Sequence, residues 1–338
     1  MDLKDPLLSH QVEAVNELSK YFEKVTVITG RVGLCEVSAN VQILSSNWIK
    51  GLHVKSSLKF FMLAGNFIRR NRNTIVFSHM TEVQSAILSI PLRILRIPHF
   101  LWYAHTYKSI FLIINHYFAN GIITSTKGSC PVESNKVFPV GQAISNCNFD
   151  FSNKKNNRVK DLVHIGRFDQ SKNIFRIIDS VKKIATRKNF ELTFTQIGSP
   201  TTKAAHSYFA QANQEFAQAI EEGWLKFQPS ILRSEVSKTL KNYDAFIHAY
   251  NGSLDKSIIE ATFVGIPVLT TNPEYIEIFG SWSKQGLASV TLESELQALL
   301  DMQIIDITRE LENRRIVAFQ GHSLSNWAFQ ISKILTRI

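Results

Sequence analysis

A polar loop that runs into a short helix, residues 251–264, carries the side chains of this sequence best suited to chemistry. It reads N-G-S-L-D-K-S-I-I-E-A-T-F-V, and we expect its helix over Lys256 to Val264, ended by Gly265. A loop that opens onto a helix N-terminus presents unpaired backbone N–H groups and the positive end of the helix dipole, which suits a diphosphate. Glu260, inside the helix, can accept hydrogen bonds from two neighbouring hydroxyls. A phosphate cradle with a diol-binding carboxylate behind it predicts a nucleotide-sugar site.

A second turn, V-H-I-G-R-F-D-Q-S-K-N over residues 163–173, places two cations just after a strand. The strand ends at Gly166, and Arg167 and Lys172 follow at the edge where open α/β sheets bind ligands. Two cations there can neutralise the charge of a departing diphosphate. The alternative is that both are solvated loop residues, and the motif taken alone leaves both interpretations open.

Short apolar, β-branched runs alternate with helical periods along the chain, which predicts an α/β fold with parallel sheets. The expected strands of the first half are Val25–Ile28, Thr74–Phe77, His99–Trp102, Gly121–Ile123 and Lys136–Val140. Its expected helices are Ser9–Tyr21, Leu58–Arg70, Val83–Leu95 and Ser109–Ala119. Pro91 predicts a break in the third of these helices, because proline cannot donate the helical hydrogen bond.

The second half repeats this scheme. Its expected strands are Val163–Ile165, Glu191–Ile197, Leu225–Phe227, Ala245–His248 and Pro267–Thr270. Its expected helices are Asn173–Thr186, Lys203–Glu222, Ser234–Asn242 and Lys256–Val264. We therefore expect two Rossmann-like domains that face each other across a cleft.

The expected domain boundaries follow from a polar stretch in the middle of the chain. Residues 1–145 form an acceptor-binding domain, 146–157 a linker, 158–322 a nucleotide-sugar-binding domain, and 323–338 a helix that returns to the first domain. The first half opens with a helix at Leu8-Ser9 where such a domain normally has a strand. Either the domain lacks its first strand, or the sequence starts after it.

Three segments of the second half together resemble a known family. They are G-R-F-D-Q-S-K-N, the strand end T-Q-I-G-S at residues 195–199, and S-L-D-K-S-I-I-E-A-T-F-V-G-I-P-V-L. They are similar to the C-terminal domain of GT-B glycosyltransferases, specifically glycosyltransferase family four (glycosyl transferases group 1). The first half agrees more loosely, through F-S-H at residues 77–79, L-W-Y-A-H at 101–105 and F-P-V-G-Q-A-I at 138–144.

The resemblance implies roles for individual residues. Arg167 and Lys172 correspond to the cation pair on the donor's phosphates, and His105 to a histidine at the sugar end of the cleft. Glu260 corresponds to the second glutamate of the family's E-x7-E motif, which holds the ribose. The other positions implied to contact the donor, on its phosphates or its base, are Gly166, Ile197, Gly198, Phe227, Gln228, Ser253, Leu254, Asp255, Lys256 and Ser257.

The sequence departs from that motif at one position. The first glutamate of E-x7-E, which in the family touches the transferred sugar, is replaced here by Gly252. The departure puts the choice of sugar and the rate in question more than the fold. Asp255, three residues further on, has an alternative interpretation as the N-cap of the helix.

Charge and composition limit the partners. The net charge is +10, and between Val37 and Val132 one acidic residue, Glu82, stands against ten basic ones. The helical segment K-S-S-L-K-F-F-M-L-A-G-N-F-I-R-R-N-R, residues 55–72, can lie on an anionic membrane surface, or it can be an ordinary core-facing helix with a basic rim. Nucleic acid is not expected, because no stacking aromatics are interleaved with the cations.

Other features suggest the location and exclude other chemistries. There is no apolar signal region at the N-terminus, and the three cysteines lack C-x-x-C spacing, so we expect a cytoplasmic protein, peripheral at the inner face of the cell membrane if the basic segment binds it. No D-x-D, H-E-x-x-H, P-loop or G-x-S-x-G motif occurs, so we expect neither a metal nor a cofactor.

These inferences combine into one hypothesis with two rivals. The resemblance implies a retaining, metal-independent glycosyltransferase that moves a sugar from a nucleoside diphosphate sugar to a lipid-linked or polysaccharide acceptor in cell-surface glycan biosynthesis. Gly252 and the missing first strand also fit a catalytically impaired protein that only binds the donor. A nucleotide-sugar epimerase of the same fold would act on the donor alone.

Overall fold

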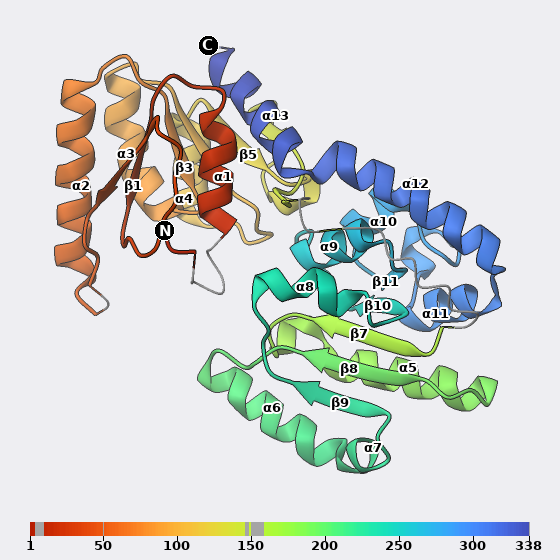
Figure 1. Cartoon of the computed structure of the whole chain (residues 1–338). Coiled ribbons are helices and arrows are strands. Elements are labelled where there is room, and N and C mark those ends of the chain that lie inside the picture. The colour runs from red at the N-terminus through yellow and green to blue at the C-terminus, as the bar shows by residue number, and fades with distance from the viewer. Residues whose placement is uncertain (4–9, 50, 146–148, 150–158, 338) are drawn as a thin grey trace. The chain divides into compact units, whose positions relative to one another are not determined.

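The computed structural model describes residues 1–3, 10–49, 51–145, 149 and 159–337, which fall into two compact units (Figure 1). Unit 1 comprises Met1–Ser145 and Gly321–Ile338, and unit 2 comprises Asn146–Gln320. Apart from residue 149, the expected linker over 146–157 lies outside the described residues, and so does the expected helix start at Leu8-Ser9. The predicted α/β class with parallel sheets is confirmed in both units.

Unit 1 is built on a parallel sheet of four strands in the order β3-β4-β5-β6. These strands are β3 (Val76–His79), β4 (His99–Trp102), β5 (Gly121–Thr124) and β6 (Val137–Pro139). A separate parallel pair is formed by β1 (Val25–Thr29) and β2 (Val41–Ser45). The sequence analysis did not predict β2.

Helices cover both faces of the four-stranded sheet. They are α1 (His10–Ser19), α2 (His53–Arg70), α3 (Glu82–Ile94), α4 (Ile110–Phe118), the 3₁₀ turn η1 (Lys127–Ser129) and α13 (Leu324–Thr336). Because side chains alternate along a strand, Trp102 of β4 packs with Trp327 of α13, and Leu101 packs on the other face with Leu112 of α4. The rings of Trp102 and Trp327 meet edge to face at 5.7 Å. Helix α13 is thus part of the core of unit 1.

Two helix predictions were wrong in detail. Helix α3 continues through Pro91 to Ile94, because Leu92 beyond the proline is buried against Ile68 of α2 and this packing outweighs one missing hydrogen bond. The single helix expected over Lys203–Glu222 is divided at Phe216 into α6 (Lys203–Glu215) and α7 (Ala217–Glu221).

Unit 2 contains a five-stranded parallel sheet in the order β11-β10-β7-β8-β9. Its strands are β7 (Asp161–Ile165), β8 (Thr193–Ile197), β9 (Leu225–Gln228), β10 (Ala245–His248) and β11 (Val268–Thr270). The chain moves outward from β7 through β8 to β9 and then returns to the other side of β7 to form β10. The strand order therefore reverses between β7 and β10, and the loops that follow these two strands diverge there, as at the ligand-binding switch point of doubly wound sheets.

The remaining helices belong to unit 2 or begin in it. They are α5 (Ile174–Lys188), α6, α7, α8 (Arg233–Leu240), α9 (Lys256–Val264), α10 (Pro273–Phe279), α11 (Leu292–Asp301) and α12 (Ile304–His322), with 3₁₀ turns η2 (Gln170–Lys172) and η3 (Leu287–Ser289). The observed bounds of α9 are those expected from the sequence. Strand residues Leu162, Phe194 and Ile247 are buried in the core with helix residues such as Ile177 and Leu296.

Candidate functional site

Lys172 and Asp255 meet at the switch point of the unit 2 sheet. Lys172 ends η2, which follows β7, and Asp255 ends the loop that follows β10. The Lys172 ammonium forms an ion pair with Asp255 Oδ2, and the Lys172 side chain is only 9% exposed. The two loops are also joined by Asn173, whose side-chain amide donates to the Ala249 carbonyl at 2.9 Å. A buried cation is therefore held at the edge where such sheets bind ligands.

A chain of hydrogen bonds that starts in the loop after β11 holds the Asp255 carboxylate in place. The Asn272 backbone N–H donates to Thr270 Oγ1 at 3.0 Å, and Thr270 Oγ1 lies 2.9 Å from His248 Nδ1. His248 Nε2 in turn lies 3.1 Å from Asp255 Oδ2. Since a carboxylate only accepts, His248 carries its proton on Nε2 and accepts at Nδ1 from the Thr270 hydroxyl.

The charges of this chain are set by its surroundings. Burial lowers the pKa of His248, although the nearby Asp255 acts in the opposite direction, so the imidazole is neutral. Burial by itself raises the pKa of Asp255, but the His248 hydrogen bond and the Lys172 charge outweigh it, and the resulting pKa is well below the usual range. Asp255 occupies the N-cap position of α9, yet its side chain makes no capping hydrogen bond. Its carboxylate is committed to Lys172 and His248 instead.

The backbones of four predicted donor-binding residues lie close together at the ends of β7, β8 and β9. The Gly166 N–H donates to the Ile197 carbonyl at 3.0 Å, and the Gly198 N–H donates to the Gln228 carbonyl at 2.9 Å. Gly198 has φ +146°, and a Cβ there would lie 1.8 Å from the Gly166 carbonyl oxygen. Only glycine allows this approach of two loops. Beneath them, buried Gln196 Nε2 donates to the Gly166 carbonyl at 2.9 Å.

Glu260, the predicted ribose ligand, has a cationic partner. Its carboxylate is 5% exposed and accepts from Arg233 Nη2 of α8 at 2.5 Å. Arg233 stands at the first position of α8, which follows β9, so α8 and α9 both present charged groups near the same edge. The sequence analysis did not select Arg233, and its only local signal was a cation at a helix start after a strand.

The other candidates lie in varied surroundings. Arg167 is exposed. His105 is exposed in unit 1, and its ring lies edge to face with that of Tyr103 at a centroid distance of 5.5 Å. The Phe227 ring packs against Phe168 at 5.2 Å, so a contact from residue 227 to a base would come from its backbone. Leu254 is buried, and Ser253, Lys256, Ser257 and Gln228 have solvent-accessible surface at the start of α9 or the end of β9.

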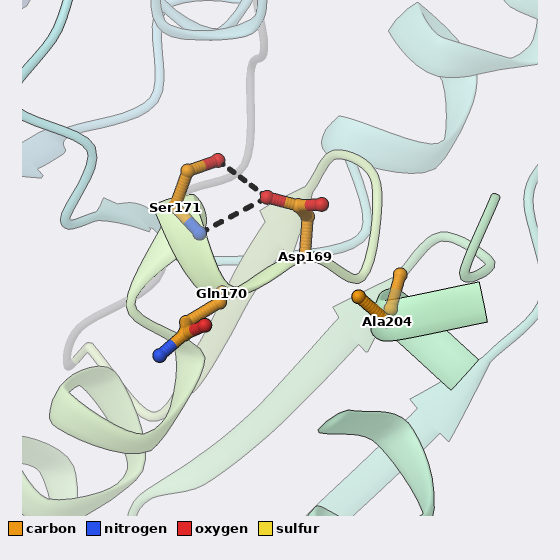
Figure 2. Close-up of a pocket in the computed structure, with 5 residues that line it drawn as sticks. Asp169, Gln170, Ser171 and Ala204 are labelled. Atoms are coloured by element: carbon orange, nitrogen blue, oxygen red, sulfur yellow. Dashed lines mark hydrogen bonds between the residues drawn. The ribbon is translucent and has the colours of Figure 1, made fainter. Parts of the chain in front are cut away.

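A cavity of about 420 Å³ lies beside the turn that carries Arg167 and Lys172 (Figure 2). Its lining residues are Asp169, Gln170, Ser171, Ala204 and Ala205. Asp169 accepts from the Ser171 backbone at 3.0 Å and from its hydroxyl at 2.6 Å, which shapes the turn (Figure 2). The cavity is thus bordered by the η2 turn and by the first residues of α6.

The site combines the features of an anion-binding edge. The Lys172 ammonium has three N–H donors and uses one for Asp255, so others remain for a ligand. Helix α9 starts next to it, with its dipole positive at that end. Within the described residues, no group of three or more His, Cys, Asp or Glu side chains is arranged to hold a metal ion. The sequence analysis did not select His248, Tyr250 or Asn272 as site residues, although all three lie at or after strand ends.

Fold and site define the class of unit 2: a doubly wound α/β domain with a buried cation and a helix N-terminus at its switch point. Residues 146–301 match the family model described as glycosyl transferases group 1. Unit 2 therefore contains a glycosyl transferases group 1 domain, and the fold of the chain is the GT-B fold of glycosyltransferases. No curated protein matches the sequence.

Solved structures agree with this fold. HepE from Anabaena, crystallised with UDP and glucose, is similar with a TM-score of 0.73 at 14% identity, covering 100% of this chain and 98% of HepE. Sucrose-phosphate synthase from Thermosynechococcus elongatus has a TM-score of 0.71 at 11% identity, covering 95% and 90%. A glycosyltransferase from Rickettsia africae has a TM-score of 0.69 at 10% identity, covering 98% and 96%. At such identities the likeness establishes the fold.

Replacing Arg233 by Met should lower the free energy of unfolding by about 2 kcal/mol, because it leaves the buried Glu260 carboxylate without its charged donor. Urea unfolding measures the loss. The matched control is Arg309→Met, which removes an ion pair to Asp306 whose side chains are 71% and 50% exposed and should cost under about 0.5 kcal/mol. In a Glu260→Gln background the Arg233→Met loss should shrink; an unchanged loss would contradict this account.

Stability should fall as pH drops below about 6.5, the ordinary histidine pKa. Burial, with a contribution from His248, lowers the pKa of His164 to about 3 despite its hydrogen bond to Gln196. Between pH 6.5 and about 3, His164 is protonated in the unfolded chain but neutral in the folded chain. Its contribution to stability is therefore fully present above pH 6.5 and is lost on acidification. In His164→Gln the slope of unfolding free energy against pH should decrease by about 1.4 kcal/mol per unit between pH 6 and 4.

Urea unfolding at a series of pH values measures this slope. His206→Gln, which removes an exposed imidazole on α6, is the matched control and should retain the steep dependence. Equal slopes for wild type and His164→Gln would show that His164 does not contribute.

Proposed function

We propose that the protein transfers a sugar from a nucleoside diphosphate sugar to a lipid-linked or polysaccharide acceptor in cell-surface glycan biosynthesis, with retention at the anomeric carbon and without a metal. The observation that carries the proposal is the buried Lys172 ammonium at the switch point, next to the start of α9. A cation next to the positive end of a helix dipole is a combination that binds a diphosphate.

The proposed position of the donor is based on the surroundings of the candidate residues. Lys172 and exposed Arg167 would contact the diphosphate, with the backbone from residue 254 to 257 at the head of α9. Glu260 would accept from the ribose hydroxyls while keeping its bond to Arg233, since a carboxylate has about four acceptor positions. The base would lie against the backbone at Gly198 and Gln228. HepE, a structural neighbour, was crystallised with UDP and glucose, which makes UDP-sugars the first donors to test.

Retention requires that the acceptor oxygen attacks the face from which the diphosphate leaves. The bond from the anomeric carbon to the phosphate oxygen breaks as the bond to the acceptor oxygen forms, and the acceptor proton passes to the departing phosphate oxygen. Lys172 and Arg167 stabilise the charge that develops on that diphosphate. His105 of unit 1 is the proposed residue at the sugar or acceptor. Asp255 stays ionised and keeps the Lys172 ammonium oriented rather than taking the proton.

The acceptor side of the proposal rests on the surface of unit 1. Helix α2 exposes Val54, Leu58 and Met62 at helical spacing, with exposures of 76%, 59% and 61%. On α3 and α4 further apolar side chains are exposed, at Val83, Ile87, Ile90, Ile94, Ile110, Ile113 and Tyr117. Exposed cations flank them on the same helices or next to them, at Lys55, Lys59, Arg69, Arg70, Arg93, Arg96 and Lys108.

This combination of apolar and basic side chains supports a role at the anionic inner face of the cell membrane. Apolar residues on α2, α3 and α4 would enter the headgroup region, and cations would contribute about 1 kcal/mol each near the surface. No helix within the described residues is long and apolar enough to cross a membrane. The proposed attachment is peripheral, and it would bring unit 1 to a lipid-linked acceptor. Nucleic acid is not a proposed partner.

The donor proposal is tested by thermal-shift binding of UDP-glucose, GDP-mannose and ADP-glucose. One of them, at 100 times its dissociation constant, should stabilise the wild type by about 2.7 kcal/mol. Arg167→Ala and Glu260→Gln should lose most of this effect, whereas Lys182→Ala, which removes an exposed cation on α5, should retain it. No stabilisation by any donor in folded protein would contradict the proposal. Binding without transfer would favour the impaired relic, and a product formed without acceptor would favour an epimerase.

The membrane proposal is tested by co-sedimentation with phosphatidylcholine vesicles that contain about one third phosphatidylglycerol. Wild type should bind them, bind pure phosphatidylcholine less, and be released by salt. The triple variant Leu58→Gln, Met62→Gln, Ile94→Gln should bind more than about tenfold more weakly, since each removes an apolar contact of about 1 kcal/mol. Ile305→Gln in unit 2, at a side chain 69% exposed, is the control and should bind as wild type. Equal binding by the triple variant would contradict this surface.

A further inference from the structure

In the loop between β10 and α9, the Tyr250 side chain fills the space that a side chain at residue 252 would need. A Cβ placed on Gly252 would lie 2.0 Å from the Tyr250 hydroxyl oxygen and 2.1 Å from its Cζ. No side chain tolerates such distances, so residue 252 must be glycine for as long as the Tyr250 ring keeps its position. The replacement of an acidic residue by Gly252 is thus linked to the tyrosine two positions earlier.

The Tyr250 ring in turn contacts the cation at the switch point. Its centroid lies 4.0 Å from Lys172 Nζ, well within the range of a cation–π interaction. The ammonium is consequently held by two groups of the same loop, the half-buried ring of Tyr250 and the carboxylate of Asp255. The ring also meets the His248 imidazole at 90° with centroids 6.2 Å apart.

The loop backbone that carries this pair is fixed from the next strand end. Asn272 is fully buried, and its side-chain amide donates to the carbonyls of Tyr250 and Gly252, each at 3.0 Å. Thr271 adds a hydrogen bond to the Asn251 side chain at 2.9 Å. Because both carbonyls are anchored by one amide, the loop cannot easily move to make room for a side chain at residue 252.

We propose that Tyr250 is a positioning residue for Lys172 and that Gly252 is the glycine that admits its ring, so that the two residues act as one unit at the diphosphate end of the donor site. The inference rests on the proposed function, because it takes Lys172 to bind the donor's diphosphate. In this inference the aromatic ring of Tyr250 holds the Lys172 ammonium, and the Tyr250 hydroxyl has no part in it. It also means that a side chain at residue 252 disturbs the site by displacing the ring.

The test is the affinity of the tightest of UDP, GDP and ADP, measured by calorimetry beside the corresponding nucleoside. Tyr250→Leu should lose about fivefold in diphosphate affinity, because it removes the cation–π contact. Tyr250→Phe keeps the ring and should stay within about twofold of wild type. Gly252→Ala should lose as much as Tyr250→Leu, but should add nothing when combined with Tyr250→Leu. The nucleoside, which has no phosphates, should bind all variants alike.

Three results would overturn the inference while leaving the proposed function intact. One is wild-type diphosphate affinity in Tyr250→Leu. Another is a Gly252→Ala loss of the same size with and without Tyr250. The third is an equal loss of nucleoside and diphosphate affinity, which would indicate a general distortion of the loop. Failure of the wild type to bind any of the three diphosphates would overturn the proposed function together with this inference.

Discussion

The reversal of strand order between β7 and β10 is the constraint on which the candidate site depends. Two neighbouring parallel strands end there, and their following loops lead to opposite sides of the sheet, so the edge between them is not covered by a crossover. Lys172 belongs to one loop and Asp255 to the other, and their ion pair connects the two loops. The same two loops are joined by a hydrogen bond from the Asn173 side-chain amide to the Ala249 carbonyl. The sheet thereby determines where a charged ligand can be bound.

Buried polar side chains of the sheet hold this edge in place, but they lower the stability of the folded protein in acid. His164 and His248 lie on adjacent strands with ring centroids 6.0 Å apart, and both are kept neutral by burial. Each contacts a loop of the site through one intermediate group at most: His248 contacts Asp255 directly, and His164 contacts Gln196, which donates to the Gly166 carbonyl. An apolar core would be more stable in acid, but it could not anchor the loops through hydrogen bonds.

Unit 1 distributes its apolar residues differently on its two sides. Trp102 and Trp327 close a dense core beneath α1 and α13. The helices α2, α3 and α4 each bury some of their side chains and leave other apolar side chains exposed, together with cations. Large exposed apolar surface on a folded protein marks a binding face. The two units therefore carry different proposed tasks, with the donor in unit 2 and the membrane surface in unit 1.

The sequence by itself determined the elements whose signal is local. Strands β4 and β10 and helix α9 have the bounds that their apolar runs and end signals predicted, because side-chain periodicity and a helix-ending glycine act over a few residues. The resemblance in the second half also led correctly to a group 1 glycosyltransferase domain. The roles of Arg167, Lys172 and Glu260 remain predictions, although the structure shows what surrounds them.

Only the tertiary structure decided which distant side chains meet. Asp255 was expected to contact the donor, with a helix cap as the alternative. It occupies the N-cap position of α9, but its carboxylate is bound to Lys172, 83 residues away in sequence. Glu260 is paired with Arg233, and the Tyr250 ring fills the space beside Gly252. The hydrophobic periodicity of the sequence indicates neither contact. Pro91 stays inside α3 because the packing of Leu92 compensates it. Periodicity records which face of an element is buried, whereas the partners across a sheet edge are set by strand order, and strand order is a property of the whole fold.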